Sequence, residues 1–163
     1  MRLKIAGIVN DSIVDGPGLR LTVFAQGCYH GCPGCHNPNT HDPVGGYYMA
    51  VDEIIETAQK NPLLSGLTLS GGEPFLQADV MCELAKKARK SGLNVIAYTG
   101  YLWEELMEDE GRKRLLLELD YLVDGPFEKD KRTLDMPFVG SSNQRVIDVK
   151  KSLETGEPVL HRF

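Results

Sequence analysis

The sequence predicts an α/β fold in the form of an open, partial (β/α) barrel, built as a single domain from residues 1–163. Segments with the pattern of buried strands alternate with segments of helical periodicity, which is typical of a parallel sheet with right-handed crossovers. A closed eight-unit barrel needs about 250 residues, whereas this chain has 163. We therefore expect about four to six units, with a ligand site at the C-terminal ends of the strands.

The first predicted elements are one strand and two amphipathic helices. Residues 19–25 combine β-branched and aromatic residues, which predicts the strand. Two later segments place apolar residues at the i, i+3, i+4 and i+7 positions of one helical face. These residues are Val51, Ile54, Ile55 and Ala58 in the first segment, and Met81, Leu84, Ala85 and Ala88 in the second. Gly92 is expected to end the second helix, because glycine readily adopts the left-handed conformation found there.

Further strands and helices alternate over the second half of the chain. Strands are predicted at residues 66–70, 93–98, 121–123 and 145–149. Residues 102–119 predict a helical region that is broken near Gly111. Cys82 lies within the second predicted helix and is expected to be a packed apolar residue. Trp103, the only tryptophan, is expected to pack against the sheet.

Composition limits the class of function. The net charge is −5, so the chain has no overall basic character of the kind that favours nucleic acid. No apolar run approaches the ~18 residues of a membrane span, and residues 1–11 lack the long apolar region of a secretory signal. We therefore expect a cytoplasmic protein, without a membrane or nucleic-acid partner, in which thiols stay reduced.

Three cysteines lie on one short loop, Cys28, Cys32 and Cys35, in a C-x3-C-x2-C pattern. Thiolates are the soft ligands of iron–sulfur clusters, and three of them leave one iron of a 4Fe-4S cluster open to bind a further molecule. A structural zinc site that includes a neighbouring histidine is the alternative. The neighbouring histidines are His30, His36 and His41. Otherwise, each of these histidines is expected to be a solvated loop residue.

A second motif follows the strand at residues 66–70, where the chain enters Gly71, Gly72, Glu73 and Pro74. Adjacent glycines at a strand end permit a ligand to approach the backbone closely. An ammonium group there could be held by carbonyl oxygens and by a carboxylate. By itself this motif is an ordinary turn, but after the cysteine motif, in this order, it is a far more specific signal.

The two motifs together resemble the radical S-adenosylmethionine enzymes, and this resemblance implies a partial barrel of their type. In that superfamily the cysteines bind a 4Fe-4S cluster, the methionine end of S-adenosylmethionine binds the open iron, and the Gly-Gly-Glu segment contacts its amino group. The residue before the third cysteine is usually aromatic but is Gly34 here, so His36 is the candidate for a flat surface against the adenine. The implied cofactor contacts are Gly34, His36, Ser70, Gly71, Gly72, Glu73, Thr99 and Asp124.

Further segments resemble the activating proteins of glycyl radical enzymes, and in particular the branch that acts on anaerobic (class III) ribonucleoside-triphosphate reductase. Val14–Gly18 together with Arg20 is similar to the start of these activases. The segments that resemble the branch are Tyr98–Tyr101, Leu122–Phe127 and Gly140–Arg145. The last of these is the most specific part of the resemblance, which extends over residues 13–151.

This resemblance implies a reaction and a protein partner. An external reductant gives one electron to the cluster, the S–C5′ bond of S-adenosylmethionine is cleaved, and the resulting 5′-deoxyadenosyl radical takes a hydrogen atom from a glycine Cα of the large reductase subunit. No catalytic residue beyond the cofactor is implied. The implied contacts with the partner are Asp15, Gly16, Gly18, Asn143 and Arg145. Asp15 could instead be a turn residue bonded to its own backbone, and Arg145 could belong to a structural ion pair.

Two other functions remain compatible with the sequence. The chain could activate another glycyl radical enzyme, such as pyruvate formate-lyase, or act on a small molecule. It could also be a zinc-binding interaction module without enzymatic activity. Metal analysis after anaerobic preparation separates the zinc module from both kinds of radical enzyme.

Overall fold

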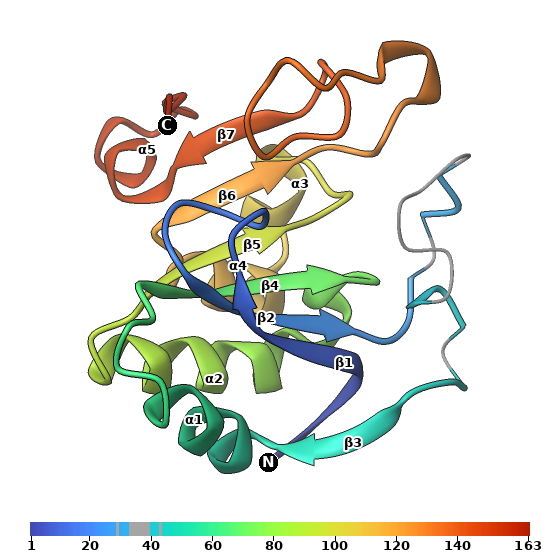
Figure 1. Ribbon diagram of the computed structural model, residues 1–163. Helices are drawn as coiled ribbons and strands as arrows, with labels where there is room; N and C mark the ends of the chain where they lie inside the picture. The colour runs from blue at the N-terminus through green and yellow to red at the C-terminus, as the bar shows by residue number, and fades with distance from the viewer. Residues whose placement is uncertain (29, 33–39, 43) are drawn as a thin grey trace.

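The computed structural model describes residues 1–28, 30–32, 40–42 and 44–163. Its centre is one open sheet in the strand order β3-β1-β2-β4-β5-β6-β7 (Figure 1). The strands are β1 (Arg2–Ser12), β2 (Arg20–Ala25), β3 (Tyr47–Ala50), β4 (Gly66–Gly71), β5 (Asn94–Tyr98), β6 (Tyr121–Asp124) and β7 (Arg145–Asp148). Because β3 and β7 form the two edges, the sheet is an incomplete barrel, and the predicted α/β class is confirmed.

Four neighbouring strands, β2, β4, β5 and β6, pair in parallel, as the alternating pattern predicts. The remaining strands pair antiparallel, with β1 and β3 on one side and β7 on the other. β1 and β3 were not predicted, because each contributes too few buried apolar residues to give a long regular pattern. In β1 the buried apolar residues are Leu3 and Ile5, while β3 has no buried residue.

The helices are α1 (Val51–Gln59), α2 (Ala78–Lys90), α3 (Trp103–Met107), α4 (Glu110–Leu116) and α5 (Val149–Thr155), with 3₁₀ turns η2 (Pro74–Gln77) and η3 (Lys129–Lys131). Gly92 follows α2 with a φ of 85°, as predicted. The helical region at 102–119 is broken at residues 108–109, before Gly111, because the Asp109 carboxylate accepts a hydrogen bond from Arg112 N and starts α4. No described helix is both long enough and apolar enough to cross a membrane.

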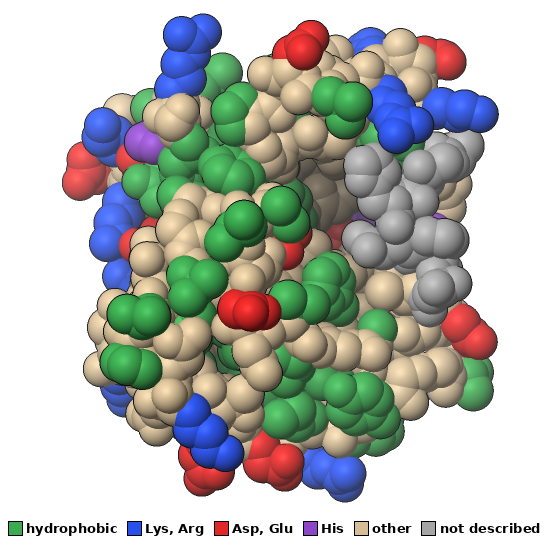
Figure 2. Space-filling model, in the orientation of Figure 1, with side chains coloured by type: hydrophobic (Ala, Val, Ile, Leu, Met, Phe, Trp, Pro, Cys, Tyr) green, Lys and Arg blue, Asp and Glu red, His purple; other side chains and the backbone are tan. Residues whose placement is uncertain are grey.

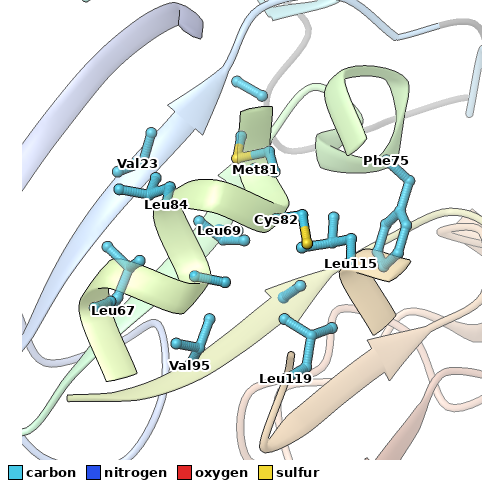
Figure 3. Close-up of a cluster of buried hydrophobic side chains, with 14 of the residues drawn as sticks. Val23, Leu67, Leu69, Phe75, Met81, Cys82, Leu84, Val95, Leu115 and Leu119 are labelled. Carbon is cyan, nitrogen blue, oxygen red and sulfur yellow. The ribbon is translucent and has the colours of Figure 1, made fainter. Parts of the chain in front are cut away.

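The hydrophobic core lies between the sheet and helices α1 to α4. Alternate residues of the parallel strands, among them Val23, Leu67 and Val95, meet the buried faces of these helices (Figure 3). Cys82 is part of this cluster, and burial raises the pKa of its thiol. Trp103 also belongs to it. The predictions for these two residues are confirmed.

The opposite face of the parallel strands carries polar residues. Arg20 is fully buried and donates hydrogen bonds to Thr68 Oγ1 at 2.7 Å, to Leu67 O at 2.9 Å and to Pro17 O at 3.1 Å. Burial lowers the pKa of Arg20 to about 10, so its guanidinium remains charged at neutral pH. Through these bonds Arg20 fixes the segment before β2 across the concave face of the sheet.

Gly71 and Gly92 provide a test of how tightly β4 packs against β2. Both have positive φ values, of 90° and 85°. A Cβ on Gly71 would lie 2.6 Å from Ala25 N, whereas a Cβ on Gly92 would have nothing within 4 Å. We expect Gly92→Ala to lower the free energy of unfolding by about 1 kcal/mol, and Gly71→Ala to lower it by at least about 2 kcal/mol more. Urea unfolding of the two variants measures this difference, and equal losses would contradict the described packing.

Candidate functional site

A pocket of about 630 Å³ lies where the parallel strands end, and Figure 2 shows this face of the molecule hollowed near its middle. Its wall includes Cys28 and Cys32 after β2, residues 70–72 at the end of β4, and residues 98–100 at the end of β5. The volume suits a small-molecule ligand. A second pocket, of about 400 Å³, is lined by residues from η2, α2 and α4, and no histidine or cysteine lines it. The first pocket is therefore the candidate site.

The loop after β2 brings two of the three predicted thiolate ligands to this pocket. Cys28 and Cys32 are both partly exposed and both line the pocket. The backbone of Cys28 is held by a hydrogen bond to His41 O at 3.1 Å. Cys35 lies outside the described residues, as do Gly34 and His36, and no three metal-binding side chains converge within the described part of the chain. Thiols at a pocket wall suit a thiolate-bound metal group.

The Gly-Gly turn after β4 packs against the start of the same loop. Gly72 N donates to Ala25 O at 2.8 Å, and Glu73 N donates to Gly27 O at 2.8 Å. A Cβ on Gly72 would collide with Gly27 O. The sequence suggests that a ligand approaches the backbone of these glycines closely. In the structure it is the backbone of the cysteine loop that does so. A large side chain at Gly72 would displace the loop that carries Cys28, in addition to any effect on a ligand.

The carboxylate of Glu73 lies behind the pocket wall, with its side chain only 1% exposed. Its Oε1 accepts hydrogen bonds from Thr99 Oγ1 and Gly100 N, both at 2.8 Å, and lies 2.6 Å from His30 Nε2. Its Oε2 accepts a hydrogen bond from Phe75 N at 3.0 Å. The protein itself thus occupies the acceptor positions of this carboxylate. A direct contact with a cofactor ammonium, as expected from the sequence, would have to displace one of these donors.

Ser70 and Thr99 occupy the positions that the sequence suggests. Both line the pocket, although only 9% and 5% of these residues is exposed. Thr99 Oγ1 both donates to Glu73 and accepts from Tyr101 N at 3.1 Å, so its orientation is fixed. Together with the backbone at residues 71 and 72, these two side chains form the polar inner wall.

Asp124 and Arg145 form an ion pair, which is the structural alternative for Arg145, while their roles in binding cofactor and substrate stay predictions. Arg145 Nε donates to Asp124 Oδ1 at 3.0 Å, and Asp124 Oδ2 accepts from Trp103 N at 2.8 Å. Arg145 also binds the Glu104 carboxylate at 3.0 Å. Neither residue lines the pocket. The hydrogen bonds with Asp124 raise the pKa of Arg145, and the bond with Arg145 lowers the pKa of Glu104. The pair joins β6, β7 and the start of α3.

Of the three expected contacts in the segment before β2, only Asp15 lines the pocket. Its carboxylate accepts hydrogen bonds from the hydroxyl groups of Ser12 and Thr22. Gly16 is buried, and a Cβ there would lie 2.8 Å from Arg20 Cδ. Gly18 has a φ of 74° and faces Ser65. The two glycines are therefore required by the turn itself, and their role in binding substrate stays a prediction.

The segment Gly140–Arg145 holds a loop to the end of β6. Gln144 Oε1 accepts from Gly140 N at 2.8 Å, and Gln144 Nε2 donates to Gly125 O at 3.0 Å. Asn143 Nδ2 donates to Pro126 O at 2.9 Å and does not line the pocket, so its described bond is structural. Gln144 does line the pocket; it belongs to a segment expected to contact the partner, although the sequence did not single it out.

His30 is the other residue whose importance the sequence did not reveal. It was expected to be solvated, but its side chain is only 18% exposed and lies against Glu73. Its ring also packs edge-to-face on Tyr101, with 4.6 Å between ring centroids. The position of His30 between Cys28 and Cys32 was the available signal in the sequence. That position alone does not reveal that Glu73 accepts its hydrogen bond.

Comparison with known proteins finds one matching family model and several similar curated proteins. A family model described as a 4Fe-4S single cluster domain matches residues 14–147. Similar curated proteins include the anaerobic ribonucleoside-triphosphate reductase-activating proteins of Vibrio cholerae serotype O1, which is 33% identical, and of Escherichia coli strain K12, which is 34% identical. The alignments cover 93% and 82% of this chain, and 92% and 91% of those proteins. The protein of that name from Enterobacteria phage T4 is 32% identical, over 82% of this chain and 86% of its own.

Among solved structures, QueE from Escherichia coli is similar over 61% of this chain and 53% of its own. The TM-score is 0.49 and the sequence identity is 15%, a likeness too weak to bear on function.

The structural role of Arg145 can be tested by comparing Arg145→Met with Glu104→Gln. Removing Arg145 leaves the buried Asp124 carboxylate without its charged partner, so we expect a loss of about 2 kcal/mol in the free energy of unfolding, reduced from the fully buried case because Arg145 is 30% exposed. Glu104 is 55% exposed, and Glu104→Gln should cost less than about 1 kcal/mol. Chemical denaturation measures both values. Wild-type stability in Arg145→Met, combined with loss of function, would instead identify Arg145 as a contact residue.

Proposed function

The chain belongs to the family of anaerobic ribonucleoside-triphosphate reductase-activating proteins, and we propose that it generates a glycyl radical on a reductase of this kind. The observation that carries the proposal is that Cys28 and Cys32 share one pocket with the ends of β4 and β5. In this arrangement a thiolate-bound cluster would lie beside the wall where a small-molecule cofactor is expected. The relatives named for this activity match most of the chain, which supports the same conclusion.

Cys28, Cys32 and Cys35 are the proposed ligands of a 4Fe-4S cluster. The family match supports a cluster of this type, and the two described cysteines both line the pocket. S-adenosylmethionine would occupy the pocket against Ser70, Gly71, Gly72 and Thr99, with Gly34 and His36 proposed from sequence alone. When bound, a reduced cluster supplies the electron for cleaving S-adenosylmethionine, which provides the means to remove hydrogen from a glycine Cα.

The chain's own residues would bind and orient the cofactor and keep water away from it. Thr99 and Ser70 are held at the strand ends with little exposure to solvent. Glu73 is engaged by its own chain, so it is proposed to hold the strand ends in place and to meet the cofactor only if one of its donors moves away. This arrangement requires no side chain to act as a general acid or base.

The partner's glycine-bearing segment would enter at the open side of the pocket. Asp15 lines this pocket, as do three exposed apolar residues, Val14, Leu134 and Met136. Leu134 is 88% exposed. Exposed apolar side chains at the opening suit contact with another polypeptide. The reaction also needs an external one-electron reductant.

The cluster proposal predicts a contrast among the four cysteines. Cys28→Ala, Cys32→Ala and Cys35→Ala should each abolish the iron–sulfur absorbance or leave an unstable, inactive cluster, because each removes one ligand. Cys82→Ala should bind iron normally, since Cys82 is packed in the core. Iron, sulfide and zinc are measured after anaerobic reconstitution. Stoichiometric zinc without iron would replace this proposal with the zinc-binding module.

The partner proposal predicts that cleavage of S-adenosylmethionine is coupled to a stable glycyl radical on the anaerobic reductase. Asp15→Asn should lower the radical yield several-fold while cleavage by the isolated protein continues, because Asp15 lies at the pocket opening. Electron paramagnetic resonance measures the radical, and product analysis measures cleavage. A radical formed on pyruvate formate-lyase but not on the reductase would leave the cofactor assignment intact and overturn the choice of partner.

A further inference from the structure

The donors around Glu73 come from two separate parts of the chain. Thr99, Gly100 and Phe75 lie next to the ends of β4 and β5. His30 instead belongs to the loop after β2, and its Nε2 lies 2.6 Å from Glu73 Oε1. This contact therefore links the segment between two of the proposed cluster ligands directly to the cofactor wall.

The surroundings of His30 are shaped to hold its ring. Gly100 provides the space, because a Cβ at that position would lie 2.6 Å from His30 Cδ2. Tyr101 forms a side of the site, with its ring plane at 76° to that of His30. Tyr101 is itself covered by Arg112, whose guanidinium carbon lies 4.3 Å from the centre of the tyrosine ring. His30 is thus held by a hydrogen bond and by packing.

We propose that His30 is a positioning residue, which fixes the Cys28–Cys32 segment relative to the cofactor wall through its hydrogen bond to Glu73. His30 is two residues from each of these cysteines, so fixing its ring restricts both thiols. The acceptor is a buried carboxylate, and hydrogen bonds to such groups are short and strong. This inference rests on the proposed function, because it concerns how the cluster ligands are placed against S-adenosylmethionine.

Two substitutions separate positioning from a general effect on folding. His30→Phe retains a ring to pack on Tyr101 but cannot donate a hydrogen bond. His30→Gln restores a side-chain N–H at a similar reach from the backbone. In both variants Glu73 keeps its bonds to Thr99, Gly100 and Phe75, so no buried carboxylate loses all its partners. We therefore expect both variants to fold, with melting temperatures close to that of the wild type.

The experiment is a titration of the reduced, anaerobically reconstituted proteins with S-adenosylmethionine, followed by the electron paramagnetic resonance spectrum of the cluster. Iron and sulfide contents are measured on the same samples. For His30→Phe we expect a similar iron content, but a spectral response that needs on the order of tenfold more S-adenosylmethionine, as is typical of losing one hydrogen bond to a charged group. His30→Gln should respond at concentrations close to those of the wild type.

A wild-type response in His30→Phe would overturn the positioning role, and so would an equal loss in His30→Gln. If His30→Phe holds less iron, Gly100→Ala provides the second test, because its Cβ would displace the ring while leaving the histidine in the loop. A wild-type response in Gly100→Ala would then overturn the proposal. If the wild-type cluster itself failed to respond to S-adenosylmethionine, the proposed function would fail instead.

Discussion

The close approach of two glycine-bearing turns is the constraint on which the site depends. Gly71 and Gly72 at the end of β4 lie against Ala25 and Gly27 at the end of β2, with no room for a side chain between them. The cysteine loop and the cofactor wall therefore begin at the same place. Glu73 then extends this contact to β5 through Thr99 and Gly100. The pocket is a consequence of how three parallel strands end together.

The two faces of the parallel strands have different chemistry, and both are buried. Residues such as Leu67 and Leu69 meet the helices. Thr68 and Ser70, which alternate with these leucines, face the concave side. A buried polar face is stable only if its groups are hydrogen-bonded. Arg20 donates hydrogen bonds to Thr68 and to backbone carbonyls. The Asp15 carboxylate accepts a hydrogen bond from Thr22. These hydrogen bonds satisfy the polar groups of this interior within the fold.

The sequence predicts the regular strands and helices better than it predicts contacts between residues distant in the chain. Strands β4 and β5 and helices α1 and α2 are predictable because burial imposes a regular spacing of apolar residues along each. The pairing of Asp124 with Arg145, and of His30 with Glu73, joins residues 21 and 43 positions apart, and no local pattern encodes such contacts. The cysteine spacing indicates the metal chemistry, and the ligand roles of Cys28, Cys32 and Cys35 stay predictions.

The saturated carboxylate of Glu73 also affects the thermodynamics of ligand binding. Its hydrogen bonds to Thr99, Gly100 and Phe75 order the ends of β4 and β5 in the folded protein. A ligand that enters the pocket then meets a preorganised wall and loses little affinity to immobilising it. A substitution of Glu73 would loosen three backbone segments at once. A change in ligand affinity would then be accompanied by a change in stability.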